Sequence, residues 1–174
     1  MAKLRVLVTD RDHAQGHAEA PLTLVEYGDY ECPHCGRAYP IVKEIQRQFG
    51  ERLRFVFRNF PLTQSHAHAQ QAAEAAEVAG EMAQFWPMHD LLFEKHGVLG
   101  ESSLLEYAAG LGLDRATFKR KLEGHEAEPR VREDFIGGVK SGVNGTPSFF
   151  INGVRYDDSW DLETLAGSLE RWMK

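Results

Sequence analysis

The chain contains two cysteines, Cys32 and Cys35, separated by a proline and a histidine. Two thiols at this spacing can close a structural disulfide, supply half of a zinc site, or act as a redox couple that exchanges disulfides with other molecules. These three uses place different demands on the rest of the chain, so the other residues help to decide between them.

Two of these uses find little support in the sequence. A disulfide between residues so close together would close a very small loop and would constrain the unfolded chain little. A zinc site needs four ligands, and no second cysteine pair is present. Histidine pairs that could complete a site are His13/His17, His66/His68 and His89/His96. Sequence spacing does not place them near the cysteines, although a dimer that pools two cysteine pairs around one metal stays open.

The residues around the pair favour the redox use. A helix is predicted to begin at the cysteines, and the N-terminus of a helix stabilises a thiolate at Cys32. Pro33 suits the first turn of that helix, and His34 can add positive charge and hydrogen-bond donors near the Cys32 sulfur. Each effect stabilises the reduced thiolate and so makes the disulfide easier to reduce.

Three acidic residues precede the pair. Glu26 lies in the apolar stretch LTLVEYG and permits two interpretations. It is either a strand-end carboxylate that faces solvent, or a partly buried carboxylate beneath the sulfurs that has a raised pKa and relays protons to Cys35. Asp29 and Glu31 are expected to be exposed turn residues that shape the local charge.

Three strands and one helix are predicted in the first part of the chain. Apolar alternation and β-forming residues place the strands at residues 4–8, 21–28 and 52–60. The polar segment from residue 11 to residue 21 is expected to be a loop. The helix that begins at the cysteines ends at Gly50, and Pro40 inside it predicts a kink.

The remainder of the chain predicts a helical block, a hairpin and a last helix. Helical patterns run from residue 63 to about residue 141, and TPSFFINGVRYDD predicts a β-hairpin with its turn at Asn152-Gly153. This order predicts an α/β fold with a mixed central sheet covered by helices on both faces. Residues 1–62 and 142–174 would form the two parts of this fold, and residues 63–141 would form an inserted helical subdomain.

Together these features resemble the DsbA-like branch of the thioredoxin superfamily, over essentially the whole chain. The resemblance is carried by Cys32-Pro33-His34-Cys35 after LVEYGDYE, by Pro40, and by Thr146-Pro147 before SFFING. It implies a thioredoxin-like fold with a helical insertion, and an enzyme that catalyses thiol–disulfide exchange.

The resemblance also implies roles for individual residues. Cys32 would be the exposed nucleophile and Cys35 the buried resolving cysteine. Pro147 would be a cis-proline facing the pair, and Thr146 would present backbone groups that hold an extended peptide beside Cys32. A trans proline in a turn after Asn-Gly is the alternative for Pro147.

The implied substrates are protein or peptide thiols and disulfides. Electrons would pass to or from glutathione or another dithiol protein, and no metal or organic cofactor is implied. Two other functions stay open: a glutathione-dependent isomerase or transferase, and a redox-sensing module without turnover.

Charge and hydropathy bound the partners and the compartment. The formal net charge of -6 argues against nucleic acid, and no apolar run is long enough to span a membrane. The first residues, MAKLRVLVTDRDHAQG, lack the apolar core of a signal peptide, which predicts a cytoplasmic protein if Met1 is the native start. A trimmed chain would instead belong to the periplasm or another extracytoplasmic compartment. Because cytoplasmic thiols are kept reduced, the direction of electron flow stays open.

Overall fold

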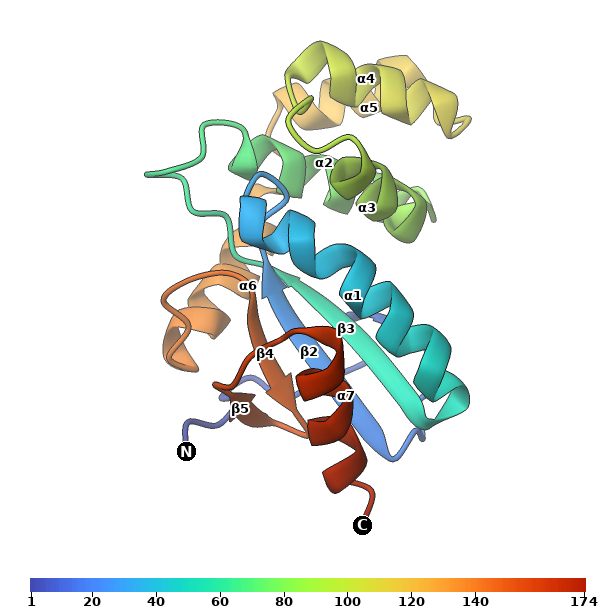
Figure 1. The fold of residues 1–174 in the computed structure, drawn as a ribbon. Coiled ribbons are helices and arrows are strands. Elements are labelled where there is room, and N and C mark those ends of the chain that lie inside the picture. The colour runs from blue at the N-terminus through green and yellow to red at the C-terminus, as the bar shows by residue number, and fades with distance from the viewer.

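A five-stranded mixed sheet lies at the centre of the computed structural model, which describes residues 1–174 (Figure 1). The strands are β1 (His13–Gln15), β2 (Leu22–Gly28), β3 (Leu53–Asn59), β4 (Ser148–Ile151) and β5 (Val154–Tyr156), in the spatial order β1-β3-β2-β4-β5. β2 and β3 are parallel, and the other pairs are antiparallel. The predicted α/β class and mixed sheet are confirmed.

Seven α-helices surround the sheet. They are α1 (Pro33–Phe49), α2 (Ala69–Glu81), α3 (Phe85–Glu94), α4 (Glu101–Gly110), α5 (Arg115–Glu123), α6 (Glu128–Lys140) and α7 (Leu162–Arg171). A short 3-10 helix, η1 (Gly50–Arg52), joins α1 to β3. α1 and α7 lie on one face of the sheet and α6 on the other, while α2 to α5 stack together beside α1 (Figure 1). None of these helices has the length and apolar character needed to cross a membrane.

Alternation along β2 determines what each face of the sheet presents. Leu24 belongs to the larger apolar core, which also contains Cys35 and the buried face of α1. Val25 and Tyr27 belong to a second, smaller core. Because successive strand residues point to opposite faces, Glu26 points to the same side as Leu24, toward the cysteines.

α6 covers the face of the sheet that carries the smaller core. Its Phe135 stacks on Phe60 with ring centroids 4.3 Å apart. The helix thus packs directly on the sheet, although it lies within residues 63–141. The division of the chain into an α/β scaffold and an inserted helical subdomain therefore remains a proposal, with α6 forming part of the scaffold's cover.

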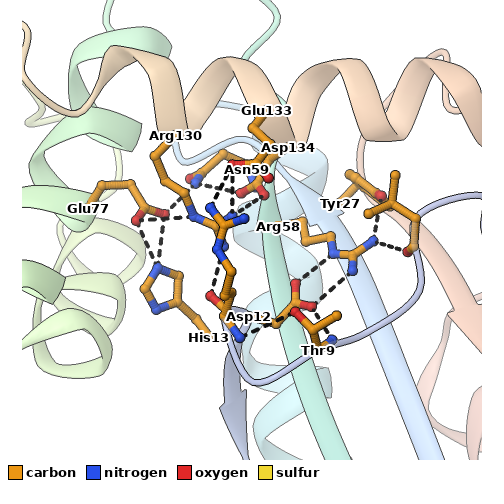
Figure 2. Close-up of polar contacts among 12 residues, drawn as sticks. Thr9, Asp12, His13, Tyr27, Arg58, Asn59, Glu77, Arg130, Glu133 and Asp134 are labelled. Carbon is orange, nitrogen blue, oxygen red and sulfur yellow. Dashed lines mark hydrogen bonds and ion pairs between the residues drawn. The ribbon is translucent and has the colours of Figure 1, made fainter.

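The predicted strand at residues 4–8 is wrong, because the first strand is β1, inside the predicted loop. Arg58 supplies the physical reason (Figure 2). Its guanidinium donates to the carbonyl oxygens of Val6 and Leu7 at 2.8 and 3.1 Å, and to both carboxylate oxygens of Asp12 at 2.8 and 3.0 Å. Successive carbonyls of a strand point in opposite directions, so two that converge on one cation cannot belong to one.

A second group of polar contacts fixes two helices at the C-terminal end of β3 (Figure 2). The Asn59 side-chain amide donates to Glu77 of α2 at 2.7 Å and to Asp134 of α6 at 3.0 Å. His13 of β1 lies 2.8 Å from the same Glu77 carboxylate. Since β2 and β3 are parallel, these contacts lie at the end of the sheet from which β2 leads to the cysteines.

Candidate active site

The two cysteines lie at the start of α1. Cys32 is the N-cap residue, Pro33 is the first helical residue, and the Gly36 N–H donates to the Cys32 carbonyl oxygen at 3.0 Å. Both cysteines are free thiols. The first turn of a helix leaves backbone N–H groups without partners in the helix, so donors are available around the Cys32 sulfur.

The surroundings give the two thiols opposite acidities. A hydrogen bond from Cys35 lowers the pKa of Cys32; burial opposes this, but hydrogen bonds from Thr146 and from the backbone of Cys35 and His34 bring it to about 5. Burial raises the pKa of Cys35 well above its usual value, as do the hydrogen bond with Cys32 and the charge of Glu26. At neutral pH the pair therefore holds one reactive thiolate and one protonated thiol.

Cys32 is not exposed, contrary to the expectation. It is 3% exposed and Cys35 is 0% exposed. The loop before β4 covers the sulfur, since Cys32 Sγ lies 3.6 Å from the carbonyl oxygen of Thr146. The peptide bond between Thr146 and Pro147 is cis. The Thr146 hydroxyl is buried and has no hydrogen-bond partner of normal geometry, and its proximity to the Cys32 sulfur lowers the pKa of that thiol.

His34 is exposed, and its ring is turned toward a neighbour on the helix surface. Its Nδ1 accepts a hydrogen bond from the Arg37 guanidinium. The influence of His34 on Cys32 is exerted by its backbone N–H.

Glu26 is buried, so its interpretation as a solvent-facing carboxylate is wrong. It is 3% exposed, and its Oε1 has no hydrogen-bond partner. Its cross-strand neighbours are Phe57 on β3 and Phe149 on β4, which surround the carboxyl group with apolar atoms. Burial, assisted by the negative charge of Cys32, raises the pKa of Glu26 to about 8. Glu26 is thus a proton-holding group near the sulfurs at neutral pH.

Asp29 is also buried, at 1% exposure, and its prediction as an exposed turn residue is wrong. Its Oδ1 accepts hydrogen bonds from the backbone N–H groups of Glu31 at 2.8 Å and Cys32 at 3.1 Å. The spacing is a signal that sequence analysis can use. An aspartate in a turn typically accepts hydrogen bonds from the backbone N–H groups two and three residues after it.

Three histidines meet the turn before Cys32, although sequence spacing does not place them there. His66 Nδ1 lies 2.8 Å from Asp29, His68 Nδ1 lies 3.0 Å from the Glu31 carboxylate, and His96 Nε2 lies 3.1 Å from the Glu31 carbonyl oxygen. These contacts come from segments far apart in the chain. No group of three or more His, Cys, Asp and Glu side chains is arranged to hold a metal ion.

Comparison with known families identifies this arrangement. The model of the family described as Thioredoxin matches residues 8–171. The chain belongs to the thioredoxin family. A Na(+)/H(+) antiporter NhaA 1 of Salinispora arenicola is 48% identical over 160 residues, which cover 92% of this chain and 24% of that protein. This thioredoxin-family chain spans about a quarter of the length of the curated relatives it matches.

Solved structures share the fold of this thioredoxin-family chain. Oxidised BdbD from Bacillus subtilis has a TM-score of 0.83 at 25% identity, with 93% of this chain and 92% of that chain covered. A thioredoxin-like oxidoreductase from Silicibacter pomeroyi has a TM-score of 0.82 at 27% identity, with 94% and 92% covered. The thiol-disulfide exchange protein alpha-DsbA2 from Wolbachia pipientis shares the fold, with a TM-score of 0.79 at 20% identity and coverage of 92% and 86%. The predicted resemblance is confirmed.

The acidity of Cys32 yields a direct prediction for the thioredoxin-family chain. Thiolate absorbance near 240 nm and alkylation by iodoacetamide should both titrate with a midpoint at about pH 5. Below that pH the alkylation rate should fall about tenfold per pH unit, because only the thiolate reacts. Cys32→Ser should remove the transition. A midpoint near the usual value of about 8.5 would show that the helix start does not activate Cys32.

Proposed function

We propose that the chain catalyses thiol–disulfide exchange with protein or peptide thiols through Cys32 and Cys35. The observation that carries the proposal is the unequal pair at the start of α1, in which the pKa of Cys32 is lowered to about 5 and Cys35 retains its proton. A thiolate of low pKa is a good leaving group in disulfide exchange. The pair therefore favours its own reduced state, which corresponds to an oxidant of other thiols.

The oxidising cycle proceeds in two exchanges. A substrate thiolate attacks the Cys32 sulfur of the Cys32–Cys35 disulfide, a mixed disulfide forms, and Cys35 leaves as a thiolate. A second substrate thiolate then attacks the substrate sulfur of the mixed disulfide. The substrate disulfide is released, Cys32 leaves as a thiolate, and the protein is left with two more electrons. In the reverse direction Cys32 attacks a substrate disulfide and Cys35 resolves it.

Glu26 is proposed as the proton donor to Cys35. When Cys35 leaves as a thiolate, the neutral Glu26 carboxyl transfers its proton to that sulfur and becomes a carboxylate, which solvent reprotonates. The burial of Glu26 and its pKa of about 8 support this role, since the acid is protonated at neutral pH and Cys35 is the stronger base.

Thr146 and Pro147 are proposed to hold the substrate. The Thr146 carbonyl oxygen lies next to the Cys32 sulfur, and the loop leads directly into β4. Backbone groups in this position suit an extended peptide that adds alongside the loop, with its own cysteine opposite Cys32. No cofactor is needed, because another dithiol or glutathione disulfide can reoxidise the pair.

An oxidant of protein thiols works best outside the reducing cytoplasm. We therefore propose an extracytoplasmic site of action in place of the cytoplasmic location expected from the first residues. Since the chain corresponds to about a quarter of its relatives' length, its first residues carry no weight on this point.

A turnover assay tests the proposal. A peptide with two cysteines is incubated with a small amount of the protein and excess glutathione disulfide, and the oxidised peptide is followed by mass spectrometry. We expect many turnovers of peptide oxidation per protein molecule. We expect the protein to accelerate the reduction of insulin by dithiothreitol only weakly. A redox sensor would oxidise the peptide once and stop, and a glutathione-dependent transferase would form glutathione conjugates without Cys35.

A further inference from the structure

The Asp29 carboxylate connects the nucleophile to a distant loop. Its side chain is fully buried and accepts four hydrogen bonds. Besides the bonds from Glu31 and Cys32, Oδ2 accepts from the Leu62 N–H at 2.9 Å and lies 2.8 Å from His66 Nδ1. One carboxylate thus ties the backbone of Cys32 to the segment that follows β3.

This arrangement presents an electrostatic problem. A buried carboxylate that bonds to the backbone of Cys32 lies close to the sulfur, and like charges disfavour each other in a site of low polarity. Without compensation, Asp29 would oppose the formation of the Cys32 thiolate.

His66 lies where it can supply the compensation. Burial disfavours its charged form, but the hydrogen bond and charge of Asp29 outweigh that effect and raise the pKa of His66; Cys32 and Glu31 act in the same direction. The ring therefore interacts with the Cys32 charge as well as with Asp29. Its side chain is mostly buried, so solvent screens these interactions only weakly.

We propose that Asp29 and His66 form a positioning pair for Cys32. The carboxylate fixes the backbone of the turn from which Cys32 projects, and the imidazolium cancels its charge beside the sulfur. This inference rests on the proposed function. The two residues lie outside the cysteine motif and set the reactivity of Cys32.

The other charged groups around the turn do not duplicate this role. His68 pairs with the Glu31 carboxylate and is more than half exposed, and His96 bonds to the Glu31 backbone carbonyl. His34 is held by Arg37 at the surface. Charges in contact with water are screened and contribute little. His66 is therefore the histidine whose positive charge compensates the negative charge of Asp29.

The thiolate titration of Cys32 tests the proposal. His66→Gln keeps a polar side chain but removes the charge, and should lower the thiolate fraction at pH 5 roughly fivefold, as a nearby uncompensated charge does. The double variant Asp29→Asn/His66→Gln removes both charges and should return the fraction to within about twofold of the wild type. His66→Lys keeps a cation and should also remain within about twofold.

His17→Gln is the matched control, because His17 is exposed and the adjacent Gly16 contacts Leu53 at the opposite end of β3. Circular dichroism checks that each variant is folded. If the double variant does not fold, His66→Lys still tests the proposal, because it keeps the cation. Equal titrations of the wild type and His66→Gln would overturn the proposal, as would a double variant or a His66→Lys variant that titrates like His66→Gln. The titration needs no turnover, so a wild type that titrates at pH 5 without turnover would count against the proposed function alone.

Discussion

Replacing Cys32 by serine is expected to lower the rate of thiol–disulfide exchange by more than about 10³-fold, to the uncatalysed level. A serine hydroxyl at the start of α1 is neither an anion at neutral pH nor able to form a disulfide.

Replacing Cys35 instead should preserve the attack of Cys32 on a substrate disulfide and remove the resolution of the mixed disulfide that results. Cys35→Ser should therefore accumulate mixed disulfides between Cys32 and substrate, which mass spectrometry of non-reduced samples detects.

The double variant Cys32→Ser/Cys35→Ser is the control for both experiments, and it should neither turn over nor trap. Both single variants have nearly the volume of the wild-type side chains, so the fold should survive, and circular dichroism checks this. Unchanged turnover in the two single variants would contradict the assignment of the redox couple.

Glu26→Gln is expected to change how stability depends on pH. The folded protein keeps the Glu26 proton to about pH 8, whereas the unfolded chain releases it near 4.5. Between these values the folded state binds more protons, so the wild type loses stability as pH rises. In the oxidised protein the negative charge of Cys32 is absent, so burial alone raises the pKa of Glu26 and the effect is smaller than in the reduced protein. Relative to Glu26→Gln, the oxidised wild type should lose about 2–3 kcal/mol of unfolding free energy between pH 5 and pH 8.

The measurement is urea unfolding of the oxidised protein, because the disulfide removes the Cys32 thiolate and its own pH dependence. Glu106→Gln, on the exposed surface of α4, is the control and should track the wild type. In the oxidising cycle, Glu26→Gln should also slow the protonation of Cys35, by on the order of 10²-fold where that step limits the rate. Parallel stability curves for wild type and Glu26→Gln would show that Glu26 ionises normally.

Local signals in the sequence were sufficient to predict the reactive cysteine pair and the helix and strands that position it. Cys32, Pro33 and Cys35 lie at a helix start because proline suits the first turn, and the β-forming residues of β2 and β3 identify the strands beside them. These features depend on residues that are close together in the sequence, so a sequence pattern can predict them.

Long-range contacts explain what the sequence did not reveal. The segment at residues 4–8 has the apolar alternation of a strand, but the buried Arg58 donates hydrogen bonds to the carbonyl oxygens of Val6 and Leu7. Glu26 is buried because Phe57 and Phe149 flank it in the folded sheet. Asp29 is buried because the segment containing Leu62 and His66 folds over it. In each case the partner comes from another part of the chain.

The reduction potential of the Cys32–Cys35 pair tests the central claim most directly. The wild-type protein is equilibrated in buffers of varied glutathione to glutathione disulfide ratio, and the oxidised fraction is measured after acid quenching and alkylation. The low pKa of Cys32 predicts a reversible disulfide with a potential less negative than about −200 mV. A potential at or below the thioredoxin value of about −270 mV, or no reversible disulfide at all, would contradict an oxidant of protein thiols.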